Sequence, residues 1–308
     1  MSDFTSAKTS HRHGVISVLV ALPFVSLTGL FGKFLTFSPL LIVQGRTVFA
    51  FGALLLALFF LRKKIFFSEH HEWLWLALSG SILGIHWIAF FQAIQVSTVA
   101  IGLLSFASYP LFTTLLEPLF FREPLRVRNV FAALIVICGL ALMATSSSDD
   151  SNTIISGSVF HGILWGLMAG FGFAVLTLLN RGHVRKHSAL LITCWQNGFA
   201  ALVILPWSIF ESWIFSGKEL GLLFLLGVVC TVGGHTLLIN GLRHVRAQVA
   251  SLLIAGLEPV FAILFALFLL GEVPSLQTLL GGVLIISTTV FIIYGTEQNE
   301  IPEQAVSK

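Results

Sequence analysis

The chain has 308 residues, of which 56% are hydrophobic and only 10% are charged, and its formal net charge is +3. Because a soluble domain carries charges at about 25% of its positions, this composition excludes a soluble enzyme, a disordered protein and a nucleic-acid-binding protein, which needs clustered lysine and arginine. With a mean hydropathy of +0.95, the chain is predicted to be an all-α integral membrane protein.

Long apolar runs follow one another along the whole chain. A helix needs about 20 apolar residues to cross the hydrocarbon core of a bilayer, and the runs lack the period-two alternation of barrel strands. The predicted transmembrane helices are ten segments: 14–36, 39–61, 72–92, 97–121, 127–145, 157–179, 188–210, 220–242, 246–270 and 275–294. The first run is too long for the apolar part of a signal peptide, so we expect it to be retained.

Basic residues are distributed unevenly over the predicted loops. If the N-terminus is cytoplasmic, the basic loop residues lie on the inner side with the exception of Lys218, whereas Asp149 and Asp150 lie outside. This asymmetry follows the positive-inside rule. We therefore expect a multi-pass protein of the plasma (inner) membrane whose tails, 1–13 and 295–308, are both cytoplasmic.

The two halves of the chain match each other when one is shifted by 149 positions. The polar and proline pairs that this shift aligns are His86 with His235, Pro110 with Pro259 and Glu123 with Glu272. Shifts of 148 and 150 positions align Gly14 with Gly162 and Ser38 with Ser188. Each half, 14–145 or 157–294, holds five predicted helices, an odd number, so the second half enters the membrane from the opposite side. The prediction is two inverted repeats joined by an outer linker, 146–156.

Inverted repeats are typical of secondary transporters, in which two equivalent halves rock about a central site. Duplication also occurs in proteins with no transport role, and that alternative remains open at this point.

Several motifs in both halves carry a family resemblance. They are AIQVS at 93–97, YPLF at 109–112, RE at 122–123, GLEPVF at 256–261 and LGE at 270–272. These stretches resemble the EamA-type transporters of the drug/metabolite transporter superfamily, and Arg46 looks like the arginine that these proteins carry in their second helix. The resemblance covers about residues 14–294. It implies a fold of two inverted five-helix repeats, a cavity lined mainly by helices 1, 3, 4, 6, 8 and 9, and export or exchange of small metabolites, often amino acids.

Ionisable residues inside the predicted helices are the first candidates for a binding or coupling site, because charge in a bilayer is costly. Glu258 lies twelve residues into its helix, near mid-membrane, and precedes Pro259. It either binds a cationic group or a proton, or holds a kink through a hydrogen bond. His86 and His235 are candidate proton relays or substrate contacts, or else neutral packing residues. Arg46 is either a cation for a substrate carboxylate or the partner of Glu258 in a structural ion pair.

Aromatic and amide side chains in the predicted helices are further candidates for the wall of a cavity. They are Trp87, Phe90, Gln92, Tyr109, Trp165 and Asn240. Pro110 and Pro259 are candidate helix kinks. The three cysteines, Cys138, Cys194 and Cys230, lie in apolar runs without metal-ligand spacing, so no metal site is expected. No cofactor is expected, and the chain has no Walker motif for ATP coupling.

The sequence thus predicts a secondary transporter, and not an enzyme, for a small organic metabolite. An amino acid or a related solute is the first candidate, and export is the expected direction. The expected partners are the small-molecule substrate, the lipid bilayer, a proton as coupling ion and a second copy of the chain in a homodimer. Uncoupled facilitation is the alternative to proton coupling, because the chain has so few charges. The alternatives are an uptake or exchange carrier of the same fold and a channel-like or scaffold membrane protein.

Overall fold

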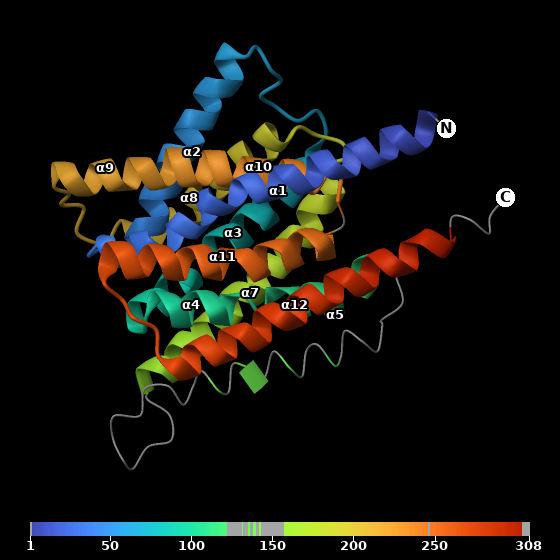
Figure 1. The fold of residues 1–308 in the computed structure, drawn as a ribbon. Coiled ribbons are helices and arrows are strands. Elements are labelled where there is room, and N and C mark those ends of the chain that lie inside the picture. Colours follow the sequence, from blue (N-terminus) through green and yellow to red (C-terminus); the bar gives the residue numbers. More distant parts are fainter. Residues whose placement is uncertain are drawn as a thin grey trace.

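The computed structural model describes residues 2–121, 157–245 and 247–303, together with five single positions between 131 and 142. Every regular element in these ranges is helical (Figure 1). The elements are α1 (Ser2–Phe34), α2 (Pro39–Phe60), α3 (His70–Val96), α4 (Val99–Phe106), α5 (Tyr109–Phe121), α7 (Gly157–His183), α8 (Ala189–Ser208), α9 (Gly217–Leu225), η1 (Leu226–His235), α10 (Thr236–Gly241), α11 (Ala247–Leu270) and α12 (Leu276–Glu303).

Eight segments of the described chain are long and apolar enough to cross a membrane. They are Arg12–Phe34, Pro39–Phe60, His70–Val96, Val99–Phe120, Gly157–His183, Ala189–Ser208, Gly217–Gly241 and Leu253–Leu270. They correspond to the predicted helices 1–4 and 6–9, and the predicted tenth helix falls on α12, with a shorter apolar part at Leu276–Thr288. The predicted fifth helix, 127–145, lies outside the described residues apart from the single positions, as does the predicted linker.

The outer surface of the bundle is apolar. Phe60, Leu119 and Phe268 each expose 77% or more of their surface. A water-soluble domain does not expose so much large apolar surface without a partner, whereas lipid chains cover it without cost. The chain is therefore a multi-pass integral membrane protein.

Equivalent serines begin the second helix of each half. The hydroxyl of Ser38 accepts a hydrogen bond from the backbone N–H of Leu41, and that of Ser188 accepts one from Leu191, both at 3.3 Å. A serine at this position satisfies one of the backbone donors that a helix leaves unpaired at its start. The aligned serines thus start α2 and α8 in the same way.

Glycines allow two close helix crossings that occupy corresponding places in the two halves. A Cβ atom added to Gly80 in α3 would lie 2.7 Å from the carbonyl oxygen of Gln196 in α8, and one added to Gly227 in η1 would lie 2.8 Å from that of Arg46 in α2. Small residues permit such close backbone approach in membranes. In both places the third helix of one half crosses the second helix of the other.

The remaining helix pairs follow the same pattern. α3, α4 and α5 pack against α7, and η1, α10 and α11 pack against α1. Figure 1 shows α1 and α7 running in opposite directions, and it shows the start of α1 on the same side as the end of α12. The two halves share one arrangement of helix contacts.

Two of the predicted helices are interrupted. The fourth is divided at Ala107–Ser108 into α4 and α5, and Pro110 is the second residue of α5. The eighth starts as α9, continues as the π-helical segment η1 and ends as α10. Segments of π-helix are rare and are frequently found at functional sites. Pro259, by contrast, lies inside α11, which is continuous.

The glycine crossings make a testable prediction. Gly227→Ala should lower the stability of the protein by about 1–3 kcal/mol, because its methyl group meets backbone atoms that cannot move aside. Gly52→Ala in α2 is the matched control, since a Cβ there has no atom within 4 Å. Thermal unfolding in detergent measures the difference, and equal melting temperatures for the two variants would contradict the crossing.

Candidate substrate site

A small central cavity of about 40 Å³ lies between helices of both halves. Its lining residues are Val25, Thr28, Arg46, His86, Trp87, Phe90, Phe106, Phe173, Cys230, His235, Leu238, Ile254 and Glu258. Four ionisable candidates from the sequence, on α2, α3, η1 and α11, therefore meet in one place. Ligand sites are commonly concave, mostly apolar and supplied with a few convergent polar groups.

The guanidinium group of Arg46 is buried and held from two sides. Its Nε and Nη2 atoms donate hydrogen bonds to Oγ1 of Thr231, at 3.1 and 2.9 Å. Its Cζ atom lies 3.5 Å from the centroid of the Trp87 ring, in a cation–π contact. The Nη1 atom is buried and has no hydrogen-bond partner among the described residues. Arg46 therefore keeps donor capacity for another acceptor.

Glu258 brings a carboxyl group to the same cavity. The residue is 5% exposed, and its backbone oxygen accepts a hydrogen bond from the Ser26 hydroxyl at 3.2 Å. Within the described ranges, its carboxyl group has neither a hydrogen bond nor an ion pair, and the ion pair with Arg46 considered above is not formed. An ionised carboxylate in such a place needs a positive partner. A proton or a bound cation would supply it.

The two histidines occupy equivalent positions in sequence but differ in their hydrogen bonds. Nδ1 of His86 lies 2.8 Å from the carbonyl oxygen of Ala169 in α7. Because a carbonyl only accepts, Nδ1 carries the proton and Nε2 is left as an acceptor in the neutral ring. Neither ring nitrogen of His235 has a partner among the described residues, and its ring meets that of Trp87 at 5.4 Å.

Aromatic rings complete the wall. Phe90 contacts Phe106 at 5.3 Å between centroids, and Phe106 contacts Phe173 at the same separation. Tyr109 lies behind them, 4.9 Å from the rings of Phe106 and Phe173, and its hydroxyl donates to the carbonyl oxygen of Ser251 at 2.7 Å. Tyr109 thus supports the wall and ties α5 to α11 without lining the cavity.

Three predicted candidates lie elsewhere. Gln92, Trp165 and Asn240 are half-buried and do not line the central cavity. Conversely, sequence reasoning missed Thr231, Phe106 and Phe173. Thr231 lies four positions before His235, and this spacing is the one local sign in the sequence that it lies near the site. Nothing in the sequence distinguishes Phe106 and Phe173 from the other phenylalanines of the chain, which has 29.

Comparison with known proteins agrees with this architecture. The model of the EamA-like transporter family matches the chain twice, at residues 12–145 and 160–294. The chain belongs to the EamA-like transporter family. The two matches correspond to the two halves found by aligning the chain with itself.

Similar proteins are named as transporters. An uncharacterized transporter, YxxF, of Bacillus subtilis is 27% identical over 209 residues, which are 67% of this chain and 65% of that protein. An S-adenosylmethionine uptake transporter of Rickettsia conorii is 30% identical over 195 residues, or 62% of each chain. The match thus spans less than two thirds of either relative.

A solved crystal structure resembles this fold. It superposes with a TM-score of 0.69 over 95% of this chain and 99% of its own, at 16% sequence identity. At that identity the likeness concerns the fold alone.

The hydrogen bonds between Arg46 and Thr231 can be tested by substituting Thr231. Thr231→Val removes the hydroxyl that accepts two guanidinium hydrogen bonds, and such charged hydrogen bonds contribute about 1.5–3 kcal/mol each. We expect KM for the transported solute to rise at least about tenfold. Thr231→Ser retains the hydroxyl and should restore the wild-type KM in proteoliposome assays. A Val variant with unchanged KM would contradict this role.

Proposed function

We propose that this protein is a secondary transporter that exports a small amino-acid-like metabolite by alternating access. The observation that carries the proposal is that Arg46 and Glu258 line one aromatic-walled cavity. Among the described residues, Nη1 of Arg46 has no hydrogen-bond partner and the carboxyl group of Glu258 has no ion pair. The carboxylate of the solute accepts hydrogen bonds from Arg46, and its ammonium group pairs with Glu258. Charge-assisted hydrogen bonds of this kind are about twice as strong as neutral ones.

The coupling ion in this proposal is a proton. A proton and a solute ammonium group neutralise the same carboxyl group, so Glu258 holds one or the other. Solute release on one side of the membrane then accompanies proton binding, and a proton gradient directed inward drives export. His86 and His235 line the same cavity and are the candidate relays.

The architecture that we propose is ten transmembrane helices in two inverted five-helix repeats, with both termini in the cytoplasm and the protein in the inner membrane. The common pattern of helix contacts, the opposite directions of α1 and α7, and the common side of the start of α1 and the end of α12 support it. A homodimer is not required by this cavity, because residues of one chain line it.

A second candidate function is uptake of a cationic metabolite. It is favoured by the similarity to proteins named S-adenosylmethionine uptake transporters. A sulfonium cation would contact Glu258 and the face of Phe90, and aromatic faces attract such cations. Counterflow in proteoliposomes loaded with S-adenosylmethionine or with amino acids separates the two functions. It also separates a carrier from a channel, which gives no counterflow.

Glu258→Gln tests the coupling. The substitution removes the titratable group and keeps the side-chain volume, so proton-driven transport should fall at least tenfold while the melting temperature changes little. Glu211→Gln, at an exposed glutamate outside the cavity, is the matched control and should transport normally. Wild-type proton-driven transport by Glu258→Gln would remove Glu258 from the mechanism.

The topology can be tested by labelling. In a variant without native cysteines, a cysteine at Ile214, in the turn after α8, should react with a membrane-impermeant thiol reagent added to whole cells. One at Phe66, in the turn before α3, should react only after the membrane is opened. Both wild-type side chains are exposed, at 82% and 62%. Labelling of both positions from the same side would overturn the proposed orientation.

A further inference from the structure

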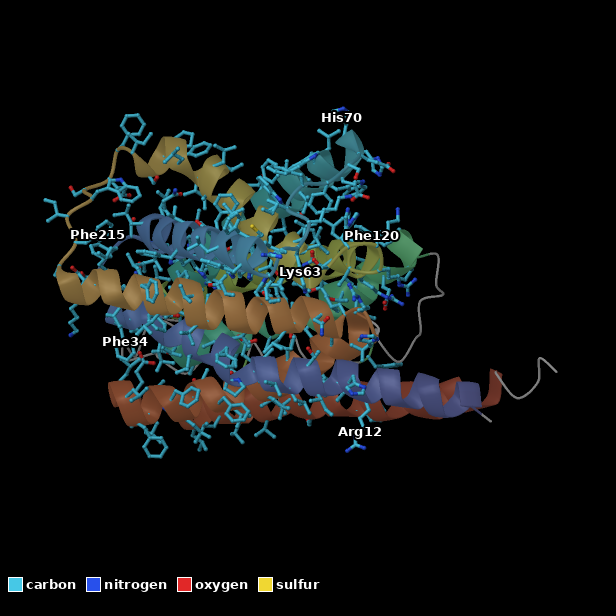
Figure 2. The ribbon with its side chains drawn as sticks, turned by 90° about the horizontal axis from the view of Figure 1, so that it is seen from above. Arg12, Phe34, Lys63, His70, Phe120 and Phe215 are labelled. Atoms are coloured by element: carbon cyan, nitrogen blue, oxygen red, sulfur yellow. The ribbon has the colours of Figure 1, made fainter. Side chains whose placement is uncertain are left out.

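A second groove lies at one end of the bundle, between α3, α5 and α7, and has a volume of about 250 Å³. Figure 2 shows His70, at the start of α3, and Phe120, near the end of α5, at the same end of the molecule, whereas Phe34 and Phe215 lie at the other end. The groove shares no lining residue with the central cavity. It is a separate feature, which the transport proposal does not use.

The acidic group of this groove already has partners. Glu72 is 6% exposed, and its carboxylate lies 3.1 Å from Nε2 of His187, 3.4 Å from Nε2 of His183 and 3.5 Å from Nε2 of His71. No grouping of His, Cys, Asp and Glu side chains in the described ranges has the arrangement of a metal site. The carboxylate is therefore buried against the imidazoles, and little of it faces the opening.

A cation remains at the rim. Lys186 lines the groove and is exposed, and its ammonium group has no hydrogen bond or ion pair within the part of the chain that the structure describes. Its backbone N–H donates to the carbonyl oxygen of His183 at 3.0 Å, which fixes the residue in the turn after α7. The charge that is available to a ligand here is thus positive.

The floor of the groove is apolar. Trp75 and Phe120 line it and expose 42% and 43% of their surface, and Leu178 and Leu179 lie beside them. Tryptophan is enriched where membrane helices reach the headgroup level. Basic pockets between transmembrane helices recognise anionic lipid headgroups. An apolar floor beneath a cationic rim fits a molecule with an acidic head and a hydrocarbon tail.

We propose that this groove binds an anionic phospholipid. The phosphate lies against Lys186, and an acyl chain lies along Trp75 and Phe120. A free phosphate ion would use the rim but not the floor. One lysine near a membrane surface favours an anionic lipid by about fivefold over a zwitterionic one.

Quenching of Trp75 by brominated lipids tests the proposal. The protein is reconstituted with brominated phosphatidylglycerol or brominated phosphatidylcholine, and the signal of Trp75 is obtained by subtracting the spectrum of Trp75→Phe. Quenching should show an about fivefold preference for phosphatidylglycerol. Lys186→Gln should abolish the preference and Lys186→Arg should retain it.

Lys63→Gln is the matched control, because Lys63 is an exposed lysine that does not line the groove. It should keep the full preference. Equal quenching of Trp75 by the two lipids, or a preference that survives Lys186→Gln, would overturn the proposal. Loss of the preference on adding inorganic phosphate at constant ionic strength would assign the rim to a free anion and would also overturn it.

Discussion

A guanidinium group buried within a membrane bundle is the constraint on which the site depends. Such a charge is stable only where hydrogen-bond acceptors and ring faces are matched closely to it. Arg46 meets this requirement with the hydroxyl of Thr231 and the face of Trp87. These partners come from η1 and α3, so the residue joins elements of both halves at the central cavity. Because Glu258 is not among its partners, both charges remain available to a solute.

The differences between the two halves are as informative as their likeness. His86 and His235 align in sequence, yet the first lies in a regular α-helix and bonds to Ala169, while the second ends a π-helical segment and has no partner among the described residues. Equivalent segments thus adopt different local structures next to the cavity. A π-helical segment beside a cavity is typical of a functional site.

The sequence was sufficient to predict the membrane helices but not the rotation of each helix about its axis. Hydrophobic runs located the eight membrane-crossing segments of the described chain, because length and composition decide them. Gln92 was expected in the wall with Phe90, but two residues along an α-helix turn the side chain by about 200°. Trp165 precedes Phe173 by eight residues, about 12 Å along α7, and so lies at another depth.

Helix irregularities were also beyond the sequence pattern. The division at Ala107–Ser108 and the π-helical conformation of η1 depend on packing against the neighbouring helices. The pattern of apolar residues is the same whether or not a helix contains such an irregularity. Thr231 contacts Arg46 from within that irregular segment, which is why this partner of Arg46 was not predicted. The internal repeat, by contrast, could be recognised in the sequence because equivalent residues of the two halves are 148–150 positions apart.

The central claim is that Arg46 and Glu258 hold opposite ends of one zwitterionic solute. Calorimetric binding to the purified protein tests it most directly, using the amino acid that most raises the melting temperature, together with its methyl ester and its N-acetyl derivative. Each derivative loses one charged hydrogen-bonding group, so both should bind at least about tenfold more weakly than the parent. Equal affinity for the parent and both derivatives would contradict the account.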